Sequence, residues 1–123
     1  MYDGYLPLDF LAGQETKSFD ITANSPWELQ VIPLGTLRVE KIPGTITGVG
    51  DDMFVIQGDG SPNLLRVDAS QASQDFIVYG IGNTTETLVD ENAPYSGTVS
   101  LSSEMRVLVV NATGPWSLEV TMK

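Results

Sequence analysis

The chain has 123 residues, with 6 Lys and Arg against 16 Asp and Glu, a formal net charge of −10, and neither Cys nor His. This charge repels nucleic acid and anionic membrane surfaces, and the missing residue types exclude thiol nucleophiles, Ser-His-Asp triads and the usual zinc sites from this chain alone. No apolar run approaches the roughly 20 residues of a spanning helix, so we expect no membrane insertion, and the length fits one domain over residues 1–123.

The first predicted strands lie near the start of the chain. Residues 19–23 and 27–31 alternate apolar and polar side chains with the period of two that is typical of β-strands. The letters NSP between them favour a turn. We therefore expect a pair of strands joined at this turn.

Further segments along the chain are rich in β-branched and aromatic residues and are separated by Gly, Pro, Asn and Asp, a pattern typical of all-β proteins. These predicted strands cover residues 52–57, 63–69, 75–81, 85–89 and 96–101. Polar or Gly-rich turns are expected at residues 58–63, 81–85 and 90–97. No window of a dozen residues carries the apolar stripe of an amphipathic helix.

The last segment, residues 106–122, matches the pattern of residues 17–33 without a gap. Trp116 falls on Trp27, and the apolar positions on both sides of the Trp coincide. We interpret the match as an internal repeat of one Trp-containing hairpin. The whole pattern predicts an all-β, antiparallel two-sheet sandwich, jelly-roll-like, with about eight or nine strands.

Five segments share their letters with a known group of domains: GTITGVGDD (44–52), NLLRV (63–67), DFIVYGIG (75–82), TLVDENAPYSGTVSL (87–101) and VLVVNATGPWSLEV (107–120). In these segments the chain resembles small extracytoplasmic β-sandwich domains of bacteria and archaea with repeated Gly/Pro-Trp strands. It is more distantly similar to bacterial pre-peptidase C-terminal domains, which are non-catalytic sandwiches. The resemblance implies an exported or cell-surface setting, and it carries no catalytic residue and no established ligand.

The expectation of export needs a signal sequence that is not present in this chain. The first ten letters, MYDGYLPLDF, lack the basic region and the long apolar region of a signal peptide. We therefore expect that Met1 is not the native start and that a leader has been removed.

The aromatic residues allow two interpretations. Trp27 and Trp116 would serve as platforms for sugar rings if they were exposed, as in a carbohydrate-binding module. Each Trp shares its strand face with aliphatic residues, however, which favours packing in the core. Tyr2, Tyr5 and Tyr95 are the remaining candidates for contact with a ligand.

Several turn carboxylates are candidates for calcium binding, namely Asp51, Asp52, Asp59, Asp90 and Glu91. Calcium takes six to eight oxygen ligands, so two of these loops would have to converge. No segment matches the twelve-residue calcium loop. The pattern favours solvated surface carboxylates and no cofactor.

A pair of carboxylates would also suit a glycosidase, but among so many acidic residues some pair must lie close by chance. Nothing in the sequence indicates a pocket or an oxyanion-stabilising loop, so we expect no enzyme. The expected function is a non-catalytic binding or interaction module of an exported or surface protein, with a protein or glycan partner. Two alternatives remain open: a carbohydrate-binding module, and a structural subunit of a surface layer, pilus or virion, which would need an unprotected sheet edge.

Overall fold

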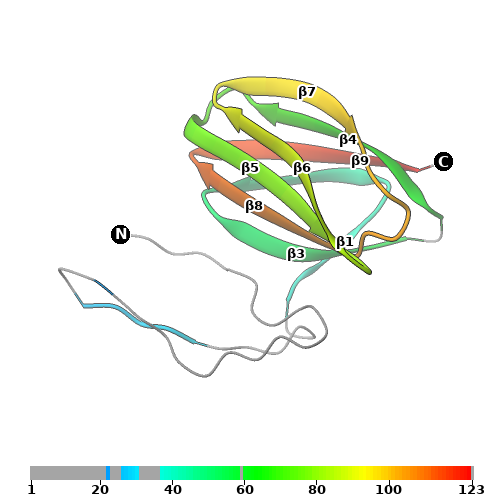
Figure 1. The fold of residues 1–123 in the computed structure, drawn as a ribbon, viewed down its shortest axis with the longest axis horizontal. Coiled ribbons are helices and arrows are strands. Elements are labelled where there is room, and N and C mark those ends of the chain that lie inside the picture. The colour runs from blue at the N-terminus through cyan, green and yellow to red at the C-terminus, as the bar shows by residue number, and fades with distance from the viewer. Residues whose placement is uncertain (1–21, 23–25, 31–36, 59, 123) are drawn as a thin grey trace.

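The computed structural model describes residues 22, 26–30, 37–58 and 60–122, and its regular structure consists of strands (Figure 1). The strands are β1 (Val39–Lys41), β2 (Gly44–Val49), β3 (Asp52–Gln57), β4 (Pro62–Ala69), β5 (Ser73–Ile81), β6 (Thr85–Asn92), β7 (Tyr95–Ser100), β8 (Val107–Thr113) and β9 (Pro115–Met122). Within these described ranges, no helix is long and apolar enough to cross a membrane.

The strands form two sheets. Sheet A has the order β1-β3-β8-β5-β6, and sheet B has the order β2-β9-β4-β7. All neighbouring strands run antiparallel except β1, which is parallel to β3. The fold is therefore the all-β, mainly antiparallel two-sheet sandwich that the turn spacing predicts.

The strand order has a simple origin in the chain. The pairs β2·β9, β3·β8, β4·β7 and β5·β6 are those of one long antiparallel ribbon that is folded back at the β5–β6 turn. When such a ribbon rolls up, its pairs alternate between two sheets, which is the arrangement of an eight-stranded jelly roll. β1 extends sheet A beyond this ribbon.

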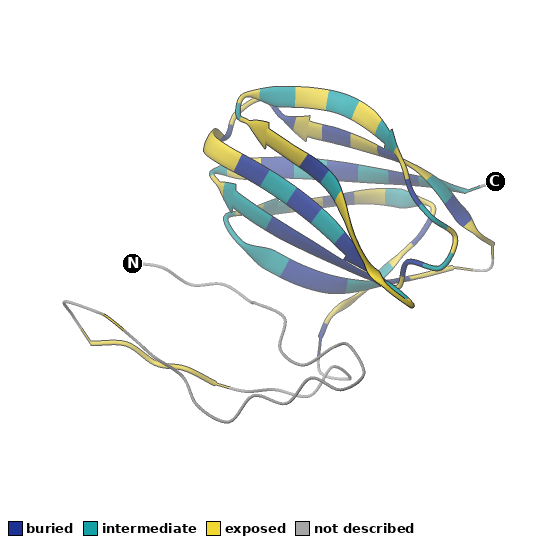
Figure 2. Ribbon diagram, viewed as in Figure 1, coloured by how far each residue is buried: buried dark blue, intermediate teal, exposed yellow. Residues whose placement is uncertain are grey.

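The main core lies between the two sheets, and along most strands buried residues alternate with more exposed ones (Figure 2). Phe54 and Phe76 from sheet A and Leu65 and Leu118 from sheet B are fully buried there. Trp116 is also buried, as its phase in the sequence predicts. A second, smaller apolar cluster is separate from the main core and contains Leu37, Met53, Ile81, Val107 and Val109.

The five central strand predictions correspond to β3 through β7. β3 has the predicted bounds, whereas β6 continues to Asn92 and β7 begins at Tyr95, so the expected polar connection at 90–97 is mostly strand. The charged letters suggested a loop, but β6 is an edge strand, where exposed carboxylates cost little and discourage unwanted pairing.

The prediction for residues 27–31 is wrong for the part that the structure describes. Residues 26–30 belong to neither sheet, and Trp27 is 60% exposed. The expectation that Trp27 packs in the core is therefore wrong. β1 and β2, which the turn-rich letters of residues 39–49 obscured, are the first strands of the described sandwich. The strand predicted at 19–23 lies outside the described residues apart from residue 22, which is not in a strand.

The second copy of the proposed repeat is not a hairpin. β8 and β9 are consecutive, but β8 pairs with β3 and β5 in sheet A, whereas β9 pairs with β2 and β4 in sheet B. Gly114 makes the corner between them with a φ of 104°, a conformation that glycine adopts without strain. Residues 113–116, TGPW, therefore carry the chain from one sheet to the other.

Candidate binding surfaces

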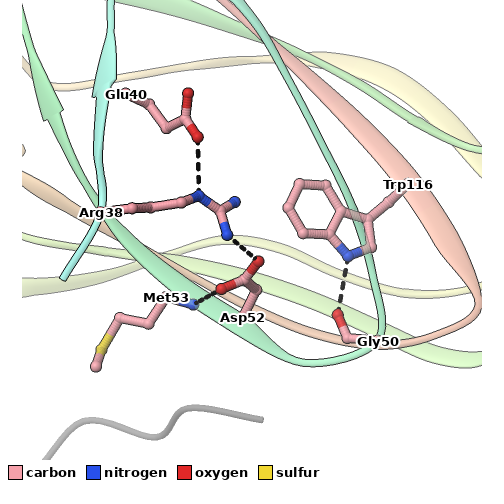
Figure 3. A network of polar contacts seen from close by, with 6 residues as sticks. All are labelled: Arg38, Glu40, Gly50, Asp52, Met53 and Trp116. Carbon is pink, nitrogen blue, oxygen red and sulfur yellow. Dashed lines mark hydrogen bonds and ion pairs between the residues drawn. The ribbon is translucent and has the colours of Figure 1, made fainter. Parts of the chain in front are cut away.

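Trp116 closes the gap between the sheets beside β2. Its ring stacks on Phe54 at 6.2 Å between centroids. Its Nε1–H donates to the backbone oxygen of Gly50 at 2.9 Å (Figure 3). Gly48 lies against the indole so closely that a Cβ there would collide with it. These contacts identify Trp116 as a packing residue and not as a platform for a sugar.

Arg38 covers the same side of the sandwich from a position just before β1. Its Nη1–H donates to Asp52 Oδ2 at 2.6 Å and its Nε–H donates to Glu40 Oε1 at 2.8 Å. The guanidinium also lies 5.0 Å from the centre of the Phe54 ring. Burial opposes the charge of Arg38, but the contacts with Asp52 and then Glu40 outweigh it, and the pKa of Arg38 is raised.

The first two calcium candidates have structural roles. Asp51 Oδ1 accepts the backbone N–H of Ala112 at 2.8 Å, which ties the β2–β3 turn to β8. Asp52 accepts the N–H of Met53 with one oxygen and the guanidinium of Arg38 with the other. Both carboxylates therefore hold strands together.

The remaining acidic candidates that the structure describes do not lie near Asp51 and Asp52. Asp90 and Glu91 lie exposed on β6, at the opposite edge of sheet A, and Asp59 lies outside the described residues. Asp52 and Val89 belong to one row across the sheet, three strand spacings or about 14 Å apart. Among the residues with described positions, no group of three or more Asp and Glu is arranged to hold a metal ion.

Sheet B carries a hollow of about 370 Å³ near the β4–β5 turn. Thr47, Ser117 and Asp68 lie in one row across β2, β9 and β4, because Ser117 is the register partner of both others. Ser70 and Gln71 from the turn also line the hollow. Most of these residues carry hydroxyl, amide or carboxylate groups, so the hollow offers hydrogen-bond donors and acceptors on a rigid sheet.

Asp68 is the charged group in this row. Its Oδ1 accepts two hydrogen bonds from Ser70, one from the hydroxyl at 2.6 Å and one from the backbone N–H at 3.0 Å. The hydroxyl bond, followed by the backbone bond, holds the pKa of Asp68 below its ordinary value. The carboxylate is thus fixed and ionised at the edge of the hollow.

The apolar part of the lining comes from two exposed residues and the buried Trp. Val49 is 74% exposed at the end of β2, and Pro115, its register partner, is exposed at the start of β9. Together with Trp116 they border the hollow. The surface of the hollow is therefore mainly apolar, with the polar row along it, a common combination in ligand sites.

The tyrosine candidates do not line this hollow as far as they are described. Tyr95 is half-buried at the start of β7 and packs against the main core, with its hydroxyl beside Gly97. Tyr2 and Tyr5 lie outside the described residues. The sequence interpretation missed the hollow, although the alternating Thr residues of GTITGV (44–49) carried a signal for an exposed polar face.

No protein-family model matches this chain, and no curated protein matches it. The resemblance to extracytoplasmic sandwich domains and to pre-peptidase C-terminal domains therefore stays a prediction.

Proposed function

We propose that this protein is a non-catalytic binding module of an exported or surface protein, and that the hollow on sheet B receives its ligand. The observation that carries the proposal is the row of Thr47, Ser117 and Asp68, three polar side chains held in register by three adjacent strands. Side chains on paired strands keep their spacing without a ligand, so binding costs little ordering entropy.

A saccharide fits this chemistry best. Its adjacent hydroxyl groups match a fixed carboxylate flanked by hydroxyls, and Val49 and Pro115 give apolar contact for its C–H surface. The buried ring of Trp116 makes stacking a minor contribution, so recognition would depend on hydrogen bonds. The fold agrees with this proposal, because jelly rolls include lectin domains.

A glycan array probed with the full chain tests the proposal, followed by calorimetry with any glycan retained. Asp68→Asn should weaken binding by about tenfold or more, because a hydrogen bond to a charged group contributes roughly 1.5–3 kcal/mol. Glu119→Gln is the matched control, since Glu119 lies on the same sheet in the adjacent outward-facing row. An array without signal, or equal losses in both variants, would refute the assignment.

The exported setting has its own test. The support for it is the sequence resemblance, and the absence of Cys is compatible with the cytoplasm and with secretion alike. Fractionation of native cells with an antibody against the chain should find it outside the cytoplasm. Recovery of the protein in the cytosolic fraction alone would contradict this part of the proposal.

A structural subunit of a surface layer, pilus or virion is the second candidate. One observation favours it, the uncharged edge strand β7, because unguarded edges are where sheets of separate molecules join. Light scattering at increasing protein concentration separates this candidate from a monomeric binding module.

A further inference from the structure

One side of the sandwich exposes part of the core. The edge strands β6 and β7 run along this side and are joined by a turn at Ala93 and Pro94 (Figure 1). Half-buried apolar side chains pack against the main core here, namely Leu88, Ala93, Tyr95 and Val99. A further strand beside β7 would cover them.

The backbone of β7 is prepared for such a strand. The N–H of Leu101 donates to the oxygen of Asn63 at 2.9 Å, and the register between β4 and β7 continues without a shift. Because hydrogen-bonded pairs alternate in an antiparallel ladder, every second residue of β7 directs its N–H and C=O away from β4. The residues with outward-directed backbone groups are Ser96, Thr98 and Ser100.

β7 also lacks the features that usually protect an edge. Its six residues, YSGTVS, contain no charge and no Pro, and its pairing has no bulge. β6 carries three acidic residues and a register shift, and β1 has three residues and ends in Lys41. β2 is uncharged too, but beside it Trp116 and Phe54 fill the gap between the sheets.

The same chain contains a segment whose side chains match this edge. Residues 26–30, PWELQ, belong to neither sheet, and Trp27 and Leu29 are 60% and 52% exposed. In an extended segment these two side chains point to one side, while Glu28 and Gln30 point to the other. One side would cover the half-buried row of the open edge, and the other would face solvent beside the Ser and Thr side chains of β7.

Residues 26–30 do not reach β7 of their own molecule. After residue 30, the next described residue is Leu37, which lies just before β1, at the edge of sheet A opposite to β6. The distance from residue 30 to residue 37 is at most about 24 Å in a fully extended chain. β1 and β6 are four strand spacings apart, about 19 Å, and β7 lies a further 10 Å or so away in the other sheet, so a path around the sandwich exceeds this reach.

We propose that β7 accepts residues 26–30 of a second copy of this chain as an added strand. Main-chain hydrogen bonds to Ser96, Thr98 and Ser100 would give the affinity, and Trp27 and Leu29 would give the specificity by covering the core at the open edge. Two copies exchanging their segments would form a closed dimer, whereas exchange in one direction would form open chains. The inference does not depend on ligand binding in the hollow.

Light scattering of the full chain over a wide concentration range tests this proposal. The wild type should increase in mass with concentration, and the double variant Trp27→Ala, Leu29→Ala should associate at least about tenfold more weakly, because large apolar side chains dominate such contacts. Both replaced side chains are exposed, so the variant should retain the wild-type melting temperature.

A matched pair of edge variants locates the contact. Thr98→Lys on β7 should weaken association, whereas Thr45→Lys on β2 should leave it unchanged, since both Thr residues are exposed on edge strands of sheet B. A wild type that stays monomeric at every concentration overturns the proposal. Association that survives the Trp27 and Leu29 variant, or that Thr98→Lys and Thr45→Lys weaken equally, overturns it as well.

Discussion

The two sides of this sandwich are built differently. On one side, Arg38, Phe54 and Trp116 close the gap between the sheets with an ion pair, a ring stack and a hydrogen bond to backbone. On the other side, β6 and β7 leave Leu88, Tyr95 and Val99 only half covered. The side chains on the first side therefore stabilise the fold. The second side leaves apolar side chains partly exposed, and such a surface can form an interface.

Removing the ring that closes the first side should have the largest effect. Trp116→Ala should lower the free energy of unfolding by about 3–5 kcal/mol, because it leaves a large cavity beside Phe54 and removes the bond to Gly50. Urea melts followed by circular dichroism measure this. Trp27→Ala is the control, and a comparable loss there would contradict the assignment of Trp27 as an exposed residue.

Gly48→Ala should act on the same ring from β2. The added methyl group would overlap the indole of Trp116, so either the ring or the strand must move, at a cost of about 1–3 kcal/mol. Thr47→Ala, one position earlier and exposed, should change stability by no more than about 0.5 kcal/mol. Equal melting midpoints for the two variants would show that the ring has room to shift.

The ion pair on the closed side should contribute less than the ring. A double-mutant cycle with Arg38→Met and Asp52→Asn should give a coupling energy of about 0.5–1 kcal/mol, since both groups remain partly exposed. The coupling should decrease as salt is added. A coupling that is zero in low salt would mean that Glu40 and Phe54 hold Arg38 in place without Asp52.

The smallest effect concerns the hollow on sheet B. Ser70→Ala removes the hydroxyl bond that mainly lowers the pKa of Asp68, so this pKa should rise toward its ordinary value in an NMR titration. Because the folded-state pKa of Asp68 is depressed, its contribution to stability is present above the unfolded-state pKa and is lost as pH falls through the folded-state pKa. An unchanged titration in the variant would show that the Ser70 backbone N–H alone lowers the pKa.

The strand predictions succeeded where local alternation and burial coincide. DMFVIQ (52–57) places Phe54 and Ile56 on the inner face, and it forms β3 with the predicted bounds. Alternation failed for Trp27, because a period of two shows only that a segment is two-sided and does not show that a sheet has a place for it. The hollow was missed because its row comes from three strands that are distant in sequence.

The sequence by itself determined the all-β class, most of the strands from β3 to β9 and the burial of Trp116, because turn residues and side-chain period are local properties of the chain. Only the tertiary structure decided that β8 and β9 lie in different sheets and that Asp51 and Asp52 bind strands instead of converging with Asp90. It also decided which edge is closed and which is open. These features depend on pairing between residues far apart in the chain, and pairing is set by the burial of the whole core.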